Sequence, residues 1–534
     1  MQLDDFLLHL HFDIDKVRPV DAQVDWEDAP LPFKLYQGLP TIPLPPSTSL
    51  QTPMSCGGRP TRLLPTGNPS LQELATLFWY TYGLTHLSHA VLPRFDEGEE
   101  ACILQALRRF VPSGGALYPS ELYAYLRVDA VPPGFYHYDV AHHRLVLLRA
   151  GNYDTYLECA LGRGCHLSSA IGVLFVSTVF WKNYFKYHDF AYRLQGLDAG
   201  VLVGQSLSVA EVCGYSGSVY FQFLDRAMNH ILGLDEKNES VYAVIPLHHV
   251  GHGPTSRERI REAPAAVTDE VLTSDVQRLN HRHYVKSQRL TPYPLLREAN
   301  LAAMFHSTDE FRSASNQELC ESTAVGEPIP LHDEDHRLAD FDIACRQRFS
   351  PALDFTSVPV SLKQLTTVLR TTARLSYTCD TEPTFQPSHP PIQLAVCVHG
   401  IDGIQDGAYL YAPDSDALHL LRSGDVRMEL QYGLSMPTVN LFQVPLCFHL
   451  VGAGDHRRAD FGYRGYRIQQ MEVGIALQRL LLAASAVGLA GHPLLGYDEA
   501  VCDRIYHFDS KRQTCLLQVP MGRYRKQSRF EGRL

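Results

Sequence analysis

The residue types that most often perform catalysis are plentiful in this chain but rarely stand at a diagnostic spacing. Its 25 histidines form no H-E-x-x-H pair, and the densest group, His281-Arg-His283, lies in a polar stretch typical of a solvated surface. The twelve cysteines form no C-x-x-C, and neither G-x-x-x-x-G-K-S/T nor G-x-G-x-x-G occurs. The segment Gly214-Tyr-Ser-Gly217 is one residue shorter than the nucleophile motif of hydrolases, so we interpret it as a turn after a helix. These patterns disfavour zinc proteases, P-loop enzymes and Rossmann dehydrogenases, and they predict no bound metal.

The bulk composition is that of a soluble globular protein. The 534 residues are 45% hydrophobic and 20% charged, and the formal net charge is -11. A mildly acidic surface argues against nucleic acid or an anionic membrane as the main partner, because either would attract a basic face. The start of the chain is acidic where a secretory signal needs positive charge, and the longest apolar run, Leu480 to Gly491, is about half of a membrane span. We therefore expect a cytoplasmic protein with free thiols and no membrane contact.

Four pairs of landmarks show that the chain contains an internal repeat. An almost constant interval, which we call the repeat offset, separates Gly134 from Gly407, Gly151 from Gly424, Tyr192-Arg193 from Tyr466-Arg467, and Pro112-Ser113 from Pro387-Ser388. A chain of this length also exceeds what one ordinary core would hold. We therefore predict two similar domains, at residues 51–250 and 341–534, preceded by a Pro-rich extension at 1–50. Residues 251–340 would join them as a linker, a lid or a docking element.

Each copy shows the same succession of elements. A short helix is followed by a Pro-Ser turn, by alternating apolar runs typical of strands, and by a long helix that is apolar nearly all round. The predicted elements are Leu71–Leu84, Leu122–Val128 and Ala199–Val212 in the first copy, Leu362–Leu375, Leu394–Val398 and Val473–Val487 in the second, and helical patches at Thr268–Leu279 and Leu296–Phe311 in the connector. A helix with apolar residues on every side belongs in the centre of a protein. The pattern therefore predicts an α+β fold with a central sheet and a buried helix in each copy.

One segment of the first copy resembles a known flavin-binding turn. It reads Arg109-Phe-Val-Pro112-Ser113-Gly114-Gly115-Ala-Leu-Tyr118-Pro119-Ser-Glu121, and it is similar to the turn of SagB-type dehydrogenases, which are azoline-oxidising members of the nitroreductase superfamily. The resemblance continues through Asp25-Trp26, Phe33-Lys34-Leu-Tyr36, Gly134 to Asp139, Lys186-Tyr187, Tyr192-Arg193 and Leu232 to Asp235. It implies two fused nitroreductase-like domains that form an intramolecular pseudo-dimer and bind FMN between them.

The resemblance also implies that each flavin site draws on both copies, and the two sites are unequal. Gly114 and Gly115 lack a Cβ and suit close approach to a flavin ring, whereas the second copy has His389-Pro390 at the equivalent turn. The second copy has the richer phosphate clamp, because basic residues stand at its start and at its end. We therefore expect one hybrid site per chain, with the opposite site empty or structural. Its expected cofactor-binding residues are Arg109, Pro112, Ser113, Gly114, Gly115, Arg346, Arg348, Arg525 and Lys526, with Glu472 and Gly474 at the flavin edge, and with Arg59 and Arg62 as the weaker clamp of the first copy.

The expected catalytic residues are Lys186 and Tyr187, which resemble the Lys-Tyr pair of azoline oxidases. The repeat offset places Asp460-Phe461 at the equivalent position of the second copy, where neither an amine nor a phenol is available. Aromatising an azoline removes a Cα proton and a Cβ hydride, so the protein must supply a base while the flavin takes the hydride. An ordinary Lys or Tyr is too fully protonated at neutral pH, but adjacent placement and burial can lower one of the two pKa values. We expect Tyr187 to be the base with the help of Lys186, and the reverse assignment stays open.

The predicted activity is FMN-dependent oxidation of thiazoline or oxazoline rings to thiazoles or oxazoles, with dioxygen as the electron acceptor. The azoline would arrive in trans, on a ribosomal precursor peptide or on a carrier protein of a peptide synthetase. Two alternatives stay open. If the protein is instead an NAD(P)H-dependent nitroreductase-like flavin reductase, NADPH should bleach its flavin without any azoline. An inactive flavin-fold scaffold in a biosynthetic complex would be colourless when purified.

Overall fold

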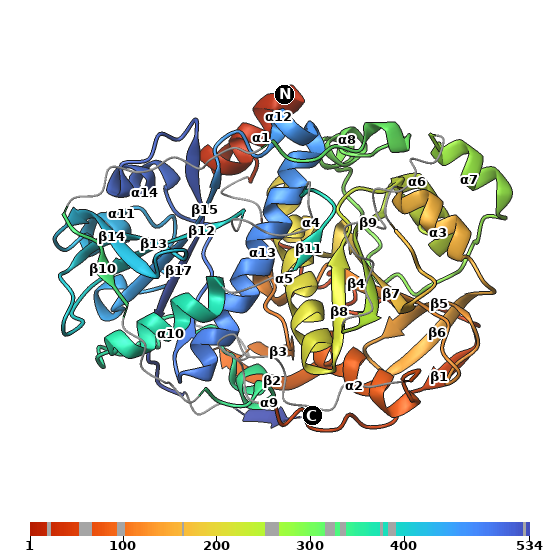
Figure 1. Ribbon diagram of the computed structural model, residues 1–534, viewed down its shortest axis with the longest axis horizontal. Helices are drawn as coiled ribbons and strands as arrows, with labels where there is room; N and C mark the ends of the chain where they lie inside the picture. Colours follow the sequence, from red (N-terminus) through yellow and green to blue (C-terminus); the bar gives the residue numbers. More distant parts are fainter. Residues whose placement is uncertain are drawn as a thin grey trace.

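The computed structural model describes residues 1–18, 23–52, 67–92, 102–162, 165–250, 266–315, 326–331, 338–373, 377–382, 391–526 and 530–533. Two sheet-containing halves flank a central pair of long helices, α5 (Ala191–Val212) and α13 (Tyr463–Ala486), as Figure 1 shows. In this described part of the chain, no helix is both long enough and apolar enough to cross a membrane.

The first half is built on a sheet of eight strands. Their order is β1-β6-β5-β4-β7-β9-β8-β11, and the pair of β11 and β8 is parallel whereas the other neighbours are antiparallel. The strands are β1 (Thr41–Pro43), β4 (Ser120–Leu126), β5 (Gly134–Asp139), β6 (Arg144–Ala150), β7 (Ala170–Val179), β8 (Tyr215–Val219), β9 (Glu239–His249) and β11 (Thr378–Cys379). Because β11 comes from the second copy, the two copies share this sheet.

The second half repeats the same strand order. Its seven strands run β10-β14-β13-β12-β15-β17-β16. They are β10 (Ile329–Pro330), β12 (Gln393–Val398), β13 (Gly407–Ala412), β14 (Ala417–Ser423), β15 (Leu446–Ala453), β16 (Ala490–Gly491) and β17 (Gln513–Gly522). Two isolated bridges, Tyr220 with Val244 and Leu494 with Gln518, are also related by the repeat offset. The duplication and the α+β fold expected from the sequence are therefore confirmed.

The helices repeat as well. α2 (Leu71–Tyr82) corresponds to α10 (Leu362–Ala373), α3 (Asp154–Leu161) to α11 (Arg427–Tyr432), and α6 (Asp225–Leu232) to α14 (Glu499–Tyr506). α2 begins where its sequence provides a capping box, because Ser70 Oγ accepts a hydrogen bond from the Glu73 amide and Glu73 Oε2 accepts one from the Ser70 amide. α5 ends at Val212, and Gly214 turns the chain into β8 with a φ of +85°. The predicted turn after a helix is therefore present.

The remaining elements surround the two halves. They are α1 (Leu3–Phe12), η1 (Ile14–Lys16), β2 (Leu84–Leu92), β3 (Cys102–Arg109), η2 (Gly114–Ala116), α4 (Trp181–Tyr187), η3 (His188–Phe190), α7 (Asp269–Asp275), α8 (Pro294–Ala302), η4 (Thr308–Glu310), α9 (Phe341–Gln347), η5 (Leu441–Gln443), α12 (Arg458–Phe461) and β18 (Phe530–Arg533). β18 pairs with β2, so the last strand of the second copy returns to the first. The edge strands β1 and β10 come from the predicted extension and the predicted connector.

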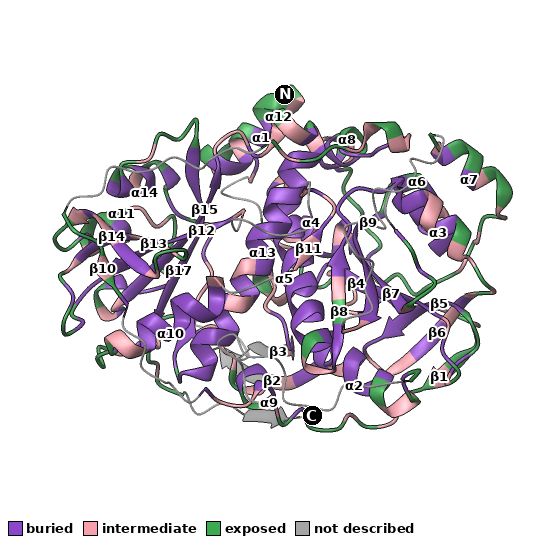
Figure 2. Cartoon of the chain, viewed as in Figure 1, coloured by how far each residue is buried: buried purple, intermediate pink, exposed green. Residues whose placement is uncertain are grey.

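The core lies where α5 and α13 cross. Both helices are buried along nearly their whole length, as the purple ribbons of Figure 2 show. A Cβ added to Gly200 would overlap the backbone of Met471, and a Cβ added to Gly474 would overlap the backbone of Gly200, so only glycine lets these helices touch. Tyr192 and Tyr466 stack nearby, with their ring centroids 5.9 Å apart. The crossing joins the two halves through one continuous core.

Candidate functional site

The predicted flavin-binding turn is a tight loop just before β4. Gly115 has a φ of +63°, in the left-handed region that favours glycine. Asp198 of α5 holds the turn, because its Oδ2 accepts a hydrogen bond from Ser113 Oγ at 2.6 Å and its Oδ1 accepts one from the Gly114 amide at 3.2 Å. Burial raises the pKa of Asp198 to about 7, and these two hydrogen bonds oppose the shift. Sequence reasoning missed Asp198, although the repeat offset pairs it with Glu472.

Lys186 and Tyr187 lie directly against this turn. They end α4, and a Cβ built on Gly115 would stand 2.6 Å from the Tyr187 hydroxyl oxygen and 3.0 Å from Lys186 Nζ. Packed atoms do not approach one another so closely, so position 115 needs glycine while the pair stays in place. The structure therefore brings the predicted catalytic pair and the predicted ring-binding turn into one site.

The surroundings shift the two pKa values in opposite directions. Burial lowers the pKa of the Lys186 amine, and the guanidinium of Arg18 lowers it further. Burial raises the pKa of the Tyr187 phenol to about 12, with Arg18 opposing that shift and Asp198 adding to it. The amine is therefore closer to its basic form at neutral pH than the phenol is. These directions favour Lys186 as the base, which is the reverse of the assignment we expected.

A buried ion pair ties the other end of α4 to the same turn. Lys182 Nζ on α4 binds Glu121 Oε1 at the start of β4, and both side chains are buried. His137 Nε2 lies 2.8 Å from the second oxygen of the Glu121 carboxylate. Burial alone would raise the pKa of Glu121, but Lys182 and His137 together hold it below its usual range. The ion pair fixes α4, and with it the catalytic pair, relative to the turn.

Arg109 lies inside the first domain, where aromatic rings surround its guanidinium. Its guanidinium carbon is 4.1 Å from the centroid of the Tyr82 ring and 4.8 Å from that of Tyr118, and its Nη2 donates to the Pro32 carbonyl at 2.8 Å. Its exposed fraction is 2%, and its Nη1 has no hydrogen-bond partner among the described residues. The structure therefore places Arg109 beneath the turn as a support, because aromatic rings and a carbonyl enclose its charge.

The second domain delivers Arg348 to the turn of the first. Arg348 follows α9, and its Nε and Nη2 donate to the carbonyls of Phe110 and Arg109 at 3.1 and 3.3 Å. Arg346 is engaged elsewhere, since its Nε pairs with Asp342 at 2.6 Å and its Nη2 donates to the Tyr80 hydroxyl at 3.3 Å. Of these two predicted phosphate ligands, Arg348 is the one at the turn.

The basic C-terminal segment of the second domain lies next to Arg348. Tyr524 stacks on Phe349 with ring centroids 5.3 Å apart, and the Arg525 amide donates to the Asp354 carbonyl at 2.9 Å. The side chains of Arg525 and Lys526 are exposed. Because Phe349 adjoins Arg348 in the sequence, the two basic segments of the second domain stand together beside the turn of the first. Pro112 is half-buried at the start of that turn, and Arg59 and Arg62 lie outside the described residues.

Glu472 and Gly474 contact partners other than the predicted flavin edge. Glu472 forms an ion pair with Arg457 of its own domain, and burial raises the pKa of Glu472 to about 7 against the effect of that arginine. Gly474 belongs to the helix crossing, where an added Cβ would stand 2.3 Å from the Leu197 carbonyl oxygen and 2.8 Å from the carbonyl carbon of Gly200. The place at the turn of the first domain is taken by Asp198, the repeat partner of Glu472, because that turn lies beside α5 and not beside α13.

At the opposite composite site, a carboxylate of the second domain binds two backbone amides of the first. The amides of Phe221 and Gln222 in the first domain donate to Asp380 Oδ1 and Oδ2 of the second, at 2.9 and 2.8 Å. The repeat offset pairs these amides with those of Leu495 and Gly496. In the described part of the chain, the amides of Leu495 and Gly496 have no hydrogen-bond partner. Two backbone amides are therefore hydrogen-bonded at one composite site, whereas the two equivalent amides of the other copy have no partner among the described residues.

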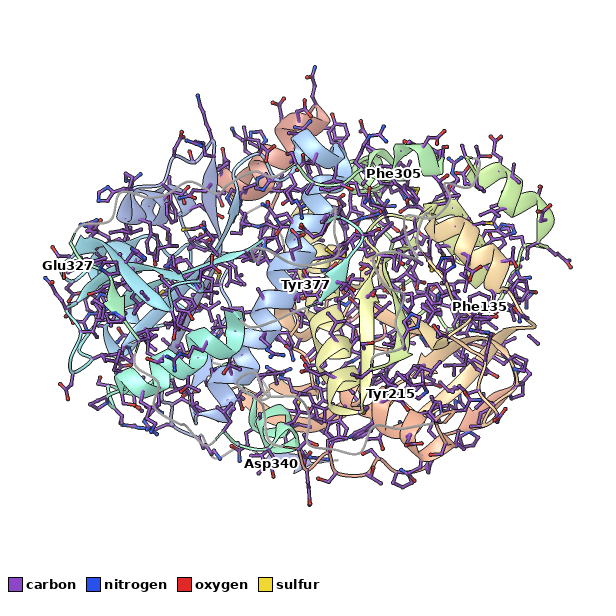
Figure 3. The ribbon with its side chains drawn as sticks, viewed as in Figure 1. Phe135, Tyr215, Phe305, Glu327, Asp340 and Tyr377 are labelled. Carbon is purple, nitrogen blue, oxygen red and sulfur yellow. The ribbon has the colours of Figure 1, made fainter. Side chains whose placement is uncertain are left out.

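The described residues around the turn of the second copy differ from the predicted catalytic pair of the first. Tyr377 precedes it and lies beside α13 in Figure 3, and burial raises the pKa of this tyrosine well above its usual value. Asp460 and Phe461 end α12 where α4 carries the catalytic pair in the first copy, and Asp460 Oδ1 accepts hydrogen bonds from Ser315. His389 lies outside the described residues. The described residues of this site thus offer no counterpart of the Lys186 amine.

The donor set of the open site fits a flavin mononucleotide. An isoalloxazine ring needs backbone that can approach closely, and Gly115, which has no Cβ, provides it. A phosphate needs cations, and the second domain provides Arg348 and the exposed pair Arg525 and Lys526. Within the described residues, no group of three or more His, Cys, Asp and Glu side chains could hold a metal ion.

Comparisons with known proteins agree with this architecture. Residues 433–523 match the model of the nitroreductase family. The whole chain is similar to the crystal structure of a protein from Anabaena variabilis that is provisionally named a nitroreductase, with a TM-score of 0.72 and 22% identity over 98% of this chain and 99% of the other. That likeness shows the fold of both domains together.

Two curated relatives match shorter segments. The trifolitoxin-processing protein TfxB of Rhizobium leguminosarum bv. trifolii is 29% identical over 153 residues, which are 27% of this chain and 41% of TfxB. A protein of Methanocaldococcus jannaschii, provisionally named a nitroreductase, is 25% identical over 135 residues, which are 25% of this chain and 65% of that protein. The match therefore spans less than two thirds of either relative. With the repeated strand order, these similarities show that the chain carries two domains of the nitroreductase fold, fused in tandem.

Proposed function

We propose that the protein is an FMN-dependent oxidase that converts thiazoline or oxazoline rings of peptides to thiazoles or oxazoles. The observation that carries this proposal is the packing of Lys186 and Tyr187 on the Gly115 turn. It supplies a half-buried base where a ring held against the turn would present its Cα hydrogen. The likeness to TfxB supports a peptide substrate, because that relative is named for the processing of trifolitoxin. The azoline would come on a precursor peptide or on a carrier protein, delivered in trans.

The chain's own residues would divide the work as follows. The Lys186 amine, whose pKa is lowered by burial, takes the Cα proton of the azoline. The Tyr187 phenol keeps its proton, since its pKa is raised to about 12, and its hydroxyl holds the ring in place as a hydrogen-bond donor. Asp198 and the Lys182–Glu121 ion pair hold the turn and α4 at a fixed separation. Bound FMN would supply the acceptor for the Cβ hydride and pass the electrons to dioxygen.

A direct assay tests this function. The purified protein is offered a thiazoline peptide in air, and mass spectrometry follows the loss of two hydrogens. We expect conversion by the native protein, a loss of at least about 100-fold in Lys186→Ala, as removal of a general base requires, and a smaller loss in Tyr187→Phe. Lys286→Ala is the matched control, because Lys286 is an exposed lysine of the connector. Equal conversion by all four proteins would refute the roles given to Lys186 and Tyr187.

A second candidate is an NAD(P)H-dependent flavin reductase. The likeness to the Methanocaldococcus protein named as a nitroreductase favours it. Under anaerobic conditions, NADPH should then bleach the flavin without any azoline, and Lys186→Ala should bleach as fast as the native protein. Azoline oxidation that depends on Lys186 would decide for the first candidate. A colourless protein that neither retains nor takes up FMN would instead indicate a scaffold.

A further inference from the structure

The N-terminal segment links the second domain to the catalytic pair of the first. α1 packs on the second domain, where His11 Nε2 lies 3.2 Å from Thr514 Oγ1 and Arg458 Nη2 donates to Asp4 Oδ1 at 2.7 Å. Val17, a few residues beyond α1, is buried. The segment is therefore anchored on one domain and reaches the other at Arg18.

Arg18 lies over the predicted catalytic pair. Its guanidinium carbon is 5.5 Å from the centroid of the Tyr187 ring, and its own amide donates to the Ile14 carbonyl at 2.9 Å. No acidic side chain of the described residues forms an ion pair with it. The charge of Arg18 lowers the pKa values of Lys186, Tyr187 and His188 alike. A half-buried guanidinium that has no counter-ion among the described residues, next to a reactive pair, is available for a negative charge of the substrate.

Trp26 is the second residue of the N-terminal segment that lies against Lys186. The Lys186 amine is 5.3 Å from the centroid of the Trp26 ring, and that ring stands edge-on to Phe185 at 5.6 Å. Trp26 leaves about half of its surface exposed, at 55%. Arg18 and Trp26 therefore both lie beside the pair, so a ring approaching the amine meets these two side chains.

Azoline oxidation creates the negative charge that Arg18 could bind. When the Cα proton moves to Lys186 Nζ, the electron pair of the C–H bond stays on Cα and spreads onto the oxygen of the adjacent carbonyl. The Cβ hydride then leaves to the flavin acceptor named above, and the electron pair forms the new ring double bond. A donor held where charge develops stabilises such a step more than it stabilises bound substrate.

We propose that Arg18 is a catalytic residue of the first site, supplied by the N-terminal segment, which binds the carbonyl next to the azoline Cα and stabilises its developing negative charge. The proposal rests on the proposed azoline oxidation. It commits the substrate to a ring whose Cα carries an amide, ester or thioester carbonyl. It also gives the N-terminal segment a chemical role in addition to its structural one.

The test compares Arg18→Gln, Arg18→Lys and Lys16→Gln. Lys16 is the matched control, because it is an exposed cation of the same segment and pairs with Asp13 at 2.9 Å. We expect Arg18→Gln to lower kcat about 100- to 1,000-fold with a small change in KM, as loss of one oxyanion donor does. Arg18→Lys should recover part of the rate, and Lys16→Gln should match the native protein. Thermal unfolding of all variants shows whether the segment still packs.

A second readout does not need oxidation. With the flavin reduced beforehand under anaerobic conditions, no hydride can leave, and the protein can only exchange the Cα hydrogen of a thiazoline peptide with deuterated water. Exchange should be slowed in Arg18→Gln as strongly as turnover is, and hardly at all in Lys16→Gln. Native protein that exchanges and oxidises while Arg18→Gln does both within about 3-fold would overturn the role of Arg18 alone. Native protein that does neither would overturn the proposed function, and this inference with it.

Discussion

At the scale of single residues, Gly115 is where backbone and catalytic side chains constrain one another most tightly. Its left-handed conformation costs an ordinary residue about 1–2 kcal/mol. A Cβ there would in addition displace the Tyr187 hydroxyl or the Lys186 amine. One substitution therefore has two separable consequences, strain in the backbone and displacement of the pair.

We expect Gly115→Ala to lower the free energy of unfolding by about 1–2 kcal/mol through strain and also to remove most azoline oxidation, because the pair must move. Gly38→Ala is the control, since Gly38 has a φ of +69° and nothing lies within 4 Å of an added Cβ. It should show the strain without the loss of activity. Urea unfolding and turnover measured on both variants check the prediction, and full activity in Gly115→Ala would contradict the packing of Tyr187 on the turn.

The pH dependence of kcat/KM should report on Lys186. Arg18, His188 and Asp198 are the described titratable or charged groups around the pair. Because burial and Arg18 both lower the pKa of Lys186, the basic form of the amine should dominate at a lower pH than in a free lysine. The rate should rise with pH along a limb whose midpoint lies below about 10.4, the ordinary value. Arg18→Gln removes one of the lowering effects, so the limb should move to higher pH, and a shift to lower pH would argue against Lys186 as the base.

At the scale of elements, the crossing of α5 and α13 decides whether the two domains share a core. Gly474→Ala places a Cβ against the backbone of Gly200, where neither helix can yield without moving the other. We expect a loss of about 1–3 kcal/mol or more in the free energy of unfolding, as overpacking produces. Gly204→Ala is the graded control, because its Cβ would stand 3.1 Å from the nearest atom of Ile475. Replacing glycine by alanine raises the helix propensity equally at both positions. The difference between the two variants in urea unfolding therefore measures the effect of packing alone. A larger loss in Gly204→Ala would contradict the crossing.

The helices α5 and α13 also show how much of the structure a sequence pattern can predict. Their existence and burial follow from continuous apolar character, yet both begin earlier than predicted, α5 at Ala191 and α13 at Tyr463. The early turns contain polar residues that local periodicity assigns to a surface. Arg193 is one of them, and it is fully buried because its guanidinium donates to Glu499 Oε1 at 2.9 Å and to the Leu516 carbonyl at 2.8 Å. Partners that lie in the other copy of the repeat cannot be found from a local pattern.

The site was predictable to a similar extent. The sequence could single out the Gly115 turn and the Lys186-Tyr187 pair because each is a short contiguous motif, and the structure places the two together. The carboxylate that holds the turn could not, since the repeat makes Asp198 and Glu472 equivalent, and only the packing shows which of them faces Ser113. Arg346 and Arg348 present the same difficulty. They are next-but-one neighbours in the sequence, and only the structure shows that Asp342 takes one of them and the turn takes the other.

At the scale of the whole molecule, duplication has produced two composite sites with different fates. At the first site, Arg348 of the second domain donates hydrogen bonds to carbonyls at the turn of the first domain. At the second site, Asp380 accepts hydrogen bonds from the amides that correspond to those of Leu495 and Gly496, and we expect this carboxylate to exclude a flavin there. Fusion of the copies allows such divergence, since a symmetric homodimer would have to change both of its sites together.

The stoichiometry of the cofactor should therefore be one FMN per chain. Flavin absorbance after denaturation, divided by protein concentration, measures it, and a ratio near two would contradict closure of the second site by Asp380. Arg348→Gln should lower the retained fraction, because a charge-assisted bond to the turn is worth about 1.5–3 kcal/mol, or roughly 10- to 100-fold in affinity. Arg422→Gln is the matched control, since Arg422 pairs with Glu429 at 2.5 Å on the outer face of the second domain. If both arginine variants lost flavin equally, the loss would come from the second domain as a whole, and the hybrid site would not depend on the arginine that crosses between the copies.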